Sequence, residues 1–176
     1  MEKETKAEYI ARFIKRWEGG WANDPDDSGG CTLSGLTIGT YRMYFGDDKT
    51  CKDLKNMTEK EWVYCFKKGF YWPCKADSIK NWSLALLIVD HAWNSGVKSS
   101  IKRIQRAIGT DADGIIGPKT LKILNDYPED CFYKIVEMRS RFYDNIIAKK
   151  PVLKKYKKGW LNRLNSIEYN KDLNDE

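Results

Sequence analysis

Residues 5–20 read TKAEYIARFIKRWEGG, and this stretch decides the fold class of the chain. Thr5 and Glu8 form a capping-box pattern, in which each side chain satisfies a backbone donor at the start of a helix. Apolar residues then recur at helical spacing and predict an amphipathic helix: Tyr9, Ile10, Phe13, Ile14 and Trp17. Gly19 and Gly20 predict its end, because glycine readily adopts the left-handed conformation that closes helices.

Helical patterning extends along most of the chain. Thr58 and Glu61 form a second capping box, and Pro118 and Pro128 each stand where a helix begins. Residues 19–39 differ, because their Asp, Pro, Gly and Ser predict turns that lead into a short hairpin. The sequence therefore predicts a mainly α fold with about seven or eight helices and a small Gly-rich hairpin or loop near residues 19–39. The helices expected after the first lie near residues 41–45, 58–70 and 84–93, from Ser99 or Ser100 to Gly109, from Pro118, from Pro128 and near 160–167.

The composition indicates a globular protein with an anionic partner. Of the 176 residues, 41% are apolar and 32% are charged, which is typical of a folded domain. The formal net charge of +6 favours nucleic acid, a membrane surface or bacterial wall polymers as partners. The chain opens with MEKETK, which has no apolar signal-peptide core, and no apolar run is long enough for stable membrane insertion.

The cysteine pattern argues against a disulfide framework and against a metal site. There are five Cys, an odd number, and no Cys-x-x-Cys pair. The single histidine, His91, cannot build a histidine-rich metal site. We therefore expect no metal and no cofactor, and we expect Cys31 to be a small buried thiol.

Glu18 is the first candidate for chemistry. It lies four residues after Ile14 and eight after Ile10, so it continues the apolar stripe of the first helix to the helix C-terminus. Apolar neighbours and the partial negative charge of a helix end both favour a protonated carboxyl. A carboxylic acid that keeps its proton near neutral pH is what a general acid requires. The same position would also suit a solvated glutamate at a fraying helix end.

Carboxylates and hydroxyls follow this glutamate closely. Glycosidic cleavage needs, besides the acid, a second group on the opposite face of the sugar, which acts as a nucleophile or holds a water. Asp27 and Asp24 can each take this role across a turn, whereas Asp26 is better explained as a turn former. Thr32 or Thr37 could hold the attacking water, and each could equally pair in a hairpin.

The stretch EGGWANDPDDSGG at residues 18–30, followed by Thr32, Gly35, Leu36 and Thr37, resembles the signature of glycoside hydrolase family 108. That family contains N-acetylmuramidases, often of phage or prophage origin, with a lysozyme-like fold. The resemblance implies that Glu18 is the essential acid, and the spacing that phage-type lysozymes share favours Asp27 over Asp24. The chain departs from the usual pattern at Ser28, Cys31, Leu33, Ser34 and Leu36, which puts the shape of the cleft in doubt more than its chemistry.

The second half resembles the predicted peptidoglycan-binding region that usually accompanies this family. The matching stretches are DHAWNSG at 90–96, QRAIG at 105–109, DGIIGPKT at 113–120 and GWLNR at 159–163. The resemblance implies a lysozyme-like catalytic region at 5–93 and a helical peptidoglycan-binding region at 94–168, packed together as one compact unit.

Sugar contacts need flat aromatic rings, which stack on pyranose faces, and amides or hydroxyls, which bond polar groups of the sugar. The candidates are Trp21, Thr32, Tyr71, Trp72, Trp93 and Asn94. Trp93 could equally pack in the core at a helix end, and Asn94 could close that helix.

The segment 149–158 contains six Lys and could attract anionic wall polymers or lipid headgroups. A solvated basic face explains such a segment equally well. No nucleic-acid-binding motif accompanies the charge, so we expect no nucleic-acid partner.

Together the residues and the resemblance indicate a muramidase that hydrolyses the bond between N-acetylmuramic acid and N-acetylglucosamine in peptidoglycan. Glu18 would protonate the glycosidic oxygen, and Asp27 or Asp24 would stabilise charge or activate water. One alternative is a lytic transglycosylase, in which the sugar's own hydroxyl attacks and one acid suffices. Another is a non-enzymatic wall-binding or secretion-accessory protein, since some relatives are labelled secretion activators.

The expected place of action follows from the same features. Without a signal peptide, the protein would be made in the cytoplasm and would act in the periplasm or cell wall. An endolysin of a prophage would reach that compartment through a holin, and other relatives would use secretion machinery or another non-classical route.

Overall fold

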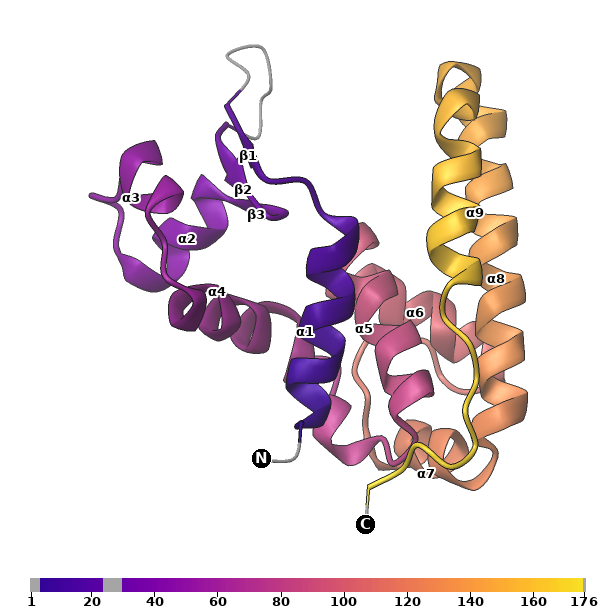
Figure 1. Cartoon of the computed structure of the whole chain (residues 1–176). Coiled ribbons are helices and arrows are strands. Elements are labelled where there is room, and N and C mark those ends of the chain that lie inside the picture. The colour runs from indigo at the N-terminus through magenta and orange to yellow at the C-terminus, as the bar shows by residue number, and fades with distance from the viewer. Residues whose placement is uncertain (1–3, 24–29, 176) are drawn as a thin grey trace. The chain divides into compact units, whose positions relative to one another are not determined.

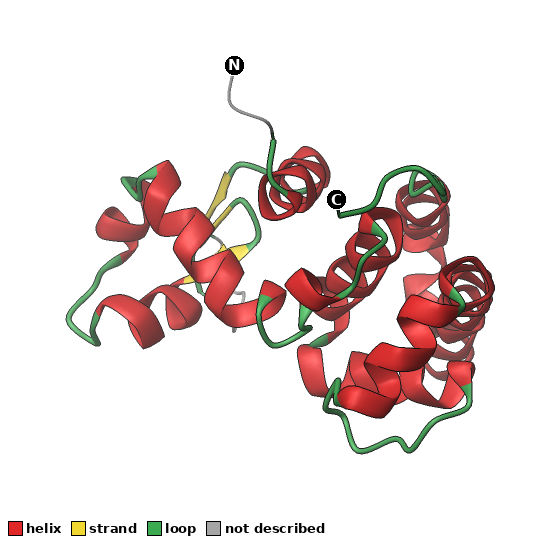
Figure 2. Cartoon of the chain, turned by 90° about the horizontal axis from the view of Figure 1, so that it is seen from below, coloured by secondary structure: helices red, strands yellow, loops and turns green. Residues whose placement is uncertain are grey.

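The computed structural model describes residues 4–23 and 30–175. The chain divides into two compact units, Met1–Gly69 (unit 1) and Phe70–Glu176 (unit 2). Both are mainly helical, as predicted, and a small sheet lies in unit 1 (Figure 1, Figure 2). The described residues form nine α-helices, one more than the largest number expected.

Unit 1 holds the N-terminal helices and the strands. The helices are α1 Lys6–Trp17, α2 Ile38–Phe45, α3 Cys51–Lys55 and α4 Glu59–Phe66, and the strands are β1 Trp21–Ala22, β2 Thr32–Leu33 and β3 Leu36–Thr37. A π-helical turn, η1 Lys67–Tyr71, follows α4 and crosses the boundary between the units. Helix α3 is the one that was not predicted, although Thr50 and Asp53 form a capping box at its start.

Helix α1 begins as predicted and ends differently. The Thr5 hydroxyl accepts a hydrogen bond from the Glu8 backbone, and the Glu8 carboxylate accepts one from the Thr5 backbone. At the other end Glu18 is itself extended, with φ −88° and ψ 145°, and caps the helix. Gly19 and Gly20 do not have positive φ, so the predicted left-handed closure is wrong. The helix stops because the chain turns into the extended segment that leads to β1.

The hairpin predicted near residues 19–39 is a three-stranded antiparallel sheet in the order β1-β2-β3. Ser34 and Gly35 form the two-residue turn between β2 and β3, and their φ angles are 46° and 78°. Positive φ at both central residues is the geometry whose twist suits a tight hairpin, and glycine adopts it at little cost. Leu36 is buried and fixes one face of the sheet on the core.

Cys31 and Cys51 form a disulfide bond with Cα atoms 5.9 Å apart. The expectation that Cys31 is a free buried thiol is therefore wrong. The bridge joins the residue before β2 to the first residue of α3. The remaining cysteines, Cys65, Cys74 and Cys131, are buried thiols. Burial raises the pKa of Cys65 to about 11, so this thiol stays protonated.

Unit 2 is built around α5 Trp82–Ser95, in which every residue from Ser83 to Ala92 is buried. Helix α5 packs against α6 Val97–Ile108 and α8 Pro128–Lys149, which also pack against each other. Helices α7 Pro118–Asp126 and α9 Lys157–Asn165 also contact α8, and Figure 1 shows α8 and α9 side by side. Two 3₁₀ segments, η2 Ala76–Ser78 and η3 Pro151–Tyr156, complete the unit.

The starts of the unit 2 helices follow the sequence signals with one exception. Pro118 and Pro128 are the first residues of α7 and α8, as predicted. Helix α6, however, begins at Val97 with Gly96 as its N-cap, and neither Ser99 nor Ser100 caps it. Gly96 has φ 77° and ψ 141°, so a single glycine with positive φ separates α5 from α6.

The boundary between the two compact units lies at Gly69. This boundary follows packing, whereas the regions expected at 5–93 and 94–168 follow the family resemblance. Helix α5 precedes the expected boundary, but its buried side chains form the core of unit 2 with α6 and α8.

The disulfide gives a direct test of the fold of unit 1. Thiol counting on the denatured, oxidised protein should find three free cysteines out of five. The double variant Cys31→Ser/Cys51→Ser should unfold more easily by about 2–4 kcal/mol, because the bridge closes a loop in the unfolded chain. Denaturant unfolding measures this difference, and five free thiols in the oxidised protein would contradict the pairing.

Candidate active site

Glu18 lies at the C-terminal end of α1 and is half-buried. Its backbone N–H donates to the carbonyls of Ile14 and Lys15, at 3.1 Å and 3.3 Å. Gly19 and Gly20, which follow, are exposed, and an added Cβ at either would meet no atom within 4 Å. The glutamate therefore stands at the end of α1, directly before two exposed glycines.

The hairpin turn is bonded to the chain just after this glutamate. The Ser34 backbone N–H donates to the Gly20 carbonyl at 3.2 Å. The indole Nε1 of Trp62, on α4, donates to the Ser34 carbonyl at 3.2 Å. These two bonds tie the sheet to α4 and to the segment after α1. The bond to Gly20 holds the hairpin turn on a residue two positions after Glu18.

Thr32 and Thr37 are brought together by the strand register. Thr32 pairs with Ala22 on one side and with Thr37 on the other. Paired residues in an antiparallel sheet place their side chains on the same face, so the two threonines share the face opposite Leu36. The Thr37 hydroxyl also caps α2 by accepting a hydrogen bond from the Thr40 N–H at 3.1 Å. Both threonines thus pair in the hairpin, one of the two roles considered for them.

Trp21 begins β1 and is half-buried. The Nζ atom of Lys55 lies 5.6 Å from the centroid of its ring, within cation–π range. Asp24 and Asp27, the candidates for the second catalytic group, lie outside the described residues, as does Asp26. They belong to the segment that joins the end of β1 to the start of β2.

The aromatic candidates Tyr71 and Trp72 have opposite environments in unit 2. Tyr71 is 1% exposed, and its hydroxyl donates to Asp77 Oδ1 at 2.6 Å. Burial and the bond to Asp77 raise the pKa of Tyr71. Its ring is a core element and offers no face to a sugar, contrary to the expectation. Trp72, by contrast, is 42% exposed.

Trp93 and Asn94 lie near the end of α5. The half-buried Trp93 ring packs on Phe70, with centroids 4.6 Å apart. The Asn94 amide donates to the Asp90 carbonyl at 2.7 Å, which satisfies a backbone acceptor in the last turn of the helix. Asn94 therefore has the helix-closing role, and its side chain remains exposed.

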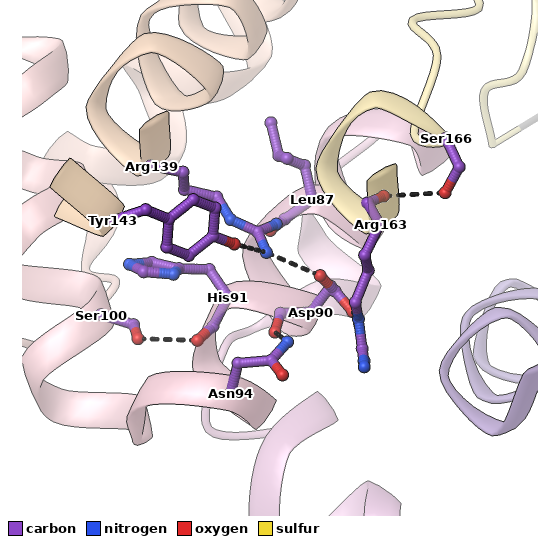
Figure 3. Close-up of polar contacts among 9 residues, drawn as sticks. All are labelled: Leu87, Asp90, His91, Asn94, Ser100, Arg139, Tyr143, Arg163 and Ser166. Atoms are coloured by element: carbon purple, nitrogen blue, oxygen red, sulfur yellow. Dashed lines mark hydrogen bonds and ion pairs between the residues drawn. The ribbon is translucent and has the colours of Figure 1, made fainter. Parts of the chain in front are cut away.

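Asp90 is a fully buried carboxylate held by two arginines (Figure 3). Its Oδ2 accepts a bond from Arg139 of α8 at 2.8 Å, and its Oδ1 accepts bonds from Arg163 of α9 at 2.8 Å and 2.9 Å. Arg139 also donates to the Tyr143 hydroxyl at 3.1 Å. The sequence did not predict this cluster, because Asp90 and Arg163 stood out only as members of the family motifs. A lone aspartate within the apolar stretch LALLIVDHAW at 84–93 could have indicated a buried ion pair.

His91 is fully buried next to this cluster (Figure 3). Neither ring nitrogen has a hydrogen-bond partner among the described residues, and the ring packs edge-on against Phe142 with centroids 5.6 Å apart. Burial, with the positive charges of Arg139 and Arg103, lowers the pKa of His91 to about 2. The imidazole is therefore neutral in the folded protein near neutral pH.

The remaining predictions concern charge, metals and membranes. The lysines of segment 149–158 lie in η3 and its flanks, largely exposed, and Lys157 pairs with Asp144 at 2.6 Å. In the described ranges, no three His, Cys, Asp or Glu side chains are placed to hold a metal ion. None of the helices described here combines the length and hydropathy needed to cross a membrane.

A helical protein with a small three-stranded sheet after its first helix has the architecture of the lysozyme-like class. A solved structure supports this fold: "Structure of Brucella abortus SagA" matches with a TM-score of 0.78 at 22% sequence identity, covering 92% of this chain and 90% of that one. A search of curated proteins found no match.

Family models identify the two regions of the chain. Residues 11–96 match the family described as glycosyl hydrolase 108, and residues 99–165 match the family described as predicted peptidoglycan domain. This confirms the resemblance read from residues 18–37 and from the second-half motifs. The chain is thus a glycoside hydrolase that acts on peptidoglycan.

Asp90 provides a test of the unit 2 cluster. Asp90→Asn should lower the free energy of unfolding by about 3–5 kcal/mol, because it leaves two guanidinium groups without their buried counter-charge. Asp144→Asn is the matched control: its ion pair with Lys157 is largely exposed and contributes less than about 1 kcal/mol. Equal losses of unfolding free energy in the two variants would show that the buried ion pairs of Asp90 stabilise the protein no more than an exposed pair.

His91 provides a pH-dependent test. The pKa of His91 in the folded protein lies below the value near 6.5 of the unfolded chain, so at mildly acidic pH only the unfolded chain binds this proton. Above pH 6.5, His91 does not lower the free energy of unfolding. As the pH falls from 7 to 5, protonation of His91 in the unfolded chain lowers the free energy of unfolding by about 2 kcal/mol. His91→Leu should remove this loss. Denaturant unfolding of the native protein and of His91→Leu should be measured at pH 7 and pH 5. Equal losses of unfolding free energy in the two proteins would contradict a buried, neutral His91.

Proposed function

We propose that the protein is a muramidase that hydrolyses the bond between N-acetylmuramic acid and N-acetylglucosamine, with Glu18 as general acid. The observation that carries the proposal is the position of Glu18 at the end of α1, immediately before the family segment that becomes β1 to β3. The match to glycosyl hydrolase 108 over residues 11–96 includes this whole region.

The reaction consumes one water molecule for each glycosidic bond that is broken. Glu18 gives its proton to the glycosidic oxygen, and the N-acetylglucosamine hydroxyl leaves as the bond to C1 of N-acetylmuramic acid breaks. A water oxygen then bonds to C1, and its proton passes to a base. Asp27, or alternatively Asp24, stabilises the positive charge at C1 or accepts that proton.

Thr37 and Thr32 are proposed to border the reacting sugar. Both hydroxyls lie on one face of the sheet, and the sheet is bonded to the chain two residues after Glu18. The Thr37 hydroxyl accepts from the Thr40 N–H and also bonds the Thr40 hydroxyl at 3.2 Å, which leaves it either its proton or one lone pair with which to orient a water.

Candidate sugar contacts remain in both units. In unit 1, Trp21 has a half-buried ring at the start of β1. In unit 2, Trp72 is exposed, and near the end of α5 the Trp93 ring is half-buried and Asn94 is exposed. Such groups suit pyranose faces and N-acetyl amides.

The partner is peptidoglycan, and the exposed lysines of segment 149–158 would add attraction to anionic wall polymers. We also propose that the enzyme acts in the periplasm or cell wall. A holin or a secretion machine would give it access to that compartment.

The decisive experiment compares the release of soluble muropeptides from purified peptidoglycan by the native protein and by Glu18→Gln. The substitution keeps the side-chain shape but removes the transferable proton, so release should fall by about 10²–10⁴-fold. Glu59→Gln is the control, because Glu59 is an exposed glutamate of the same unit. Its release should match that of the native protein.

Two outcomes would overturn the proposal. Full activity of a folded Glu18→Gln variant would remove Glu18 from the mechanism. If the native protein binds sacculi but releases nothing over a broad pH range, it is a wall-binding or secretion-accessory protein.

A further inference from the structure

A cationic cavity lies between α6 and α8 of unit 2. Its volume is about 550 Å³, within the range of roughly 300–1,000 Å³ typical of small-ligand sites. The charged residues that line it are four basic side chains and one acidic side chain: Arg103, Arg106, Lys134, Arg141 and Glu137. The excess of positive charge favours an anionic ligand.

Arg103 is the central feature of this cavity. Its guanidinium carbon lies 4.0 Å from the centroid of the Phe142 ring, so the group packs against the aromatic ring within cation–π range. Its Nη1 atom is buried and has no hydrogen-bond partner among the described residues. Burial and the neighbouring charge of Arg106 lower the pKa of Arg103. An unsatisfied buried donor is costly, and an acceptor supplied by a ligand would remove that cost.

The other charges divide into paired and unpaired groups. Lys134 pairs with Asp130 at 2.8 Å, and Arg141 pairs with Glu137 on the same helix. Arg106, within the described part of the chain, has no carboxylate partner. Arg103 and Arg106 are three residues apart on α6, so their guanidinium groups lie on one face of the helix.

The remaining walls define the ligand more closely. Ala107, Met138 and Phe142 make part of the lining apolar, which suits a small aliphatic group beside the charge. Glu137 is paired with Arg141 and Lys134 with Asp130, so the unpaired charge that a ligand would meet is that of Arg103 and Arg106, which suits one carboxylate group. Guanidinium groups bind a single carboxylate with two parallel hydrogen bonds.

We propose that the cavity between α6 and α8 binds a carboxylate of the peptide stems of peptidoglycan, with Arg103 and Arg106 as the binding residues. The inference rests on the proposed action on peptidoglycan and adds a peptide contact to the sugar contacts. Binding of the stem peptide would hold the polymer on unit 2 independently of cleavage by Glu18.

The test uses the full chain and a synthetic stem tetrapeptide in two forms, one with free carboxylates and one with all carboxylates amidated. Calorimetry should show that the native protein binds the free acid and that amidation removes the binding. Arg103→Gln/Arg106→Gln should weaken binding by at least about tenfold, because two charge-assisted hydrogen-bond donors are lost. Lys119→Gln/Lys122→Gln removes the same charge from exposed positions on α7 and should bind like the native protein.

Glu18→Gln separates this inference from the proposed function. It should bind the tetrapeptide as tightly as the native protein while failing to release muropeptides. If the native protein releases no muropeptides but binds the peptide through Arg103 and Arg106, the enzymatic proposal fails and the peptide site stands.

Three results would overturn the peptide site. They are no binding of the free-acid peptide by the native protein, equal binding by a folded Arg103→Gln/Arg106→Gln variant, and equal binding of the acid and the amide. Binding of a phosphate polymer that depends on these arginines, without peptide binding, would assign the cavity to a different wall component.

Discussion

The buried carboxylate of Asp90 connects three helices that are far apart in sequence. It lies on α5 and bonds Arg139 of α8 and Arg163 of α9. Taking these charges out of water is costly, and their mutual attraction largely offsets that cost, so each charge needs its partners to stay buried. Helix α6 packs against both α5 and α8, and the cationic cavity lies between α6 and α8. The arrangement of unit 2, including its proposed peptide site, therefore depends on this one carboxylate.

Local signals in the sequence predicted the helices well. The capping boxes of α1 and α4 and the prolines of α7 and α8 act through neighbouring backbone groups, so they can be read without tertiary contacts. Helix α3 was missed because it has only five residues, too few to show a periodic pattern. The pairing of Cys31 with Cys51 could not be deduced, because sequence spacing does not determine which cysteines meet in space.

Glu18 became a candidate because a motif and a helix pattern coincide there. It is the C-cap of α1, directly after the apolar stripe of that helix, and it lies within the matched region 11–96. Tyr71 was misjudged because the same ring suits a sugar platform and a protein core, and only packing distinguishes the two. The unit boundary at Gly69 also depends on packing, because α5 joins the helices that follow it. No pattern in the sequence near Arg103 indicated a binding site, because the ring on which its guanidinium packs belongs to Phe142 of α8.

The most direct measurement of the central claim is mass spectrometry of the products formed from purified peptidoglycan in water enriched in heavy oxygen. Hydrolysis by a muramidase predicts released fragments that end in reducing N-acetylmuramic acid and carry one heavy oxygen at that end. Fragments that end in anhydro-N-acetylmuramic acid without heavy oxygen would contradict hydrolysis and show lytic transglycosylation. Heavy oxygen on a reducing N-acetylglucosamine end would contradict the proposed bond.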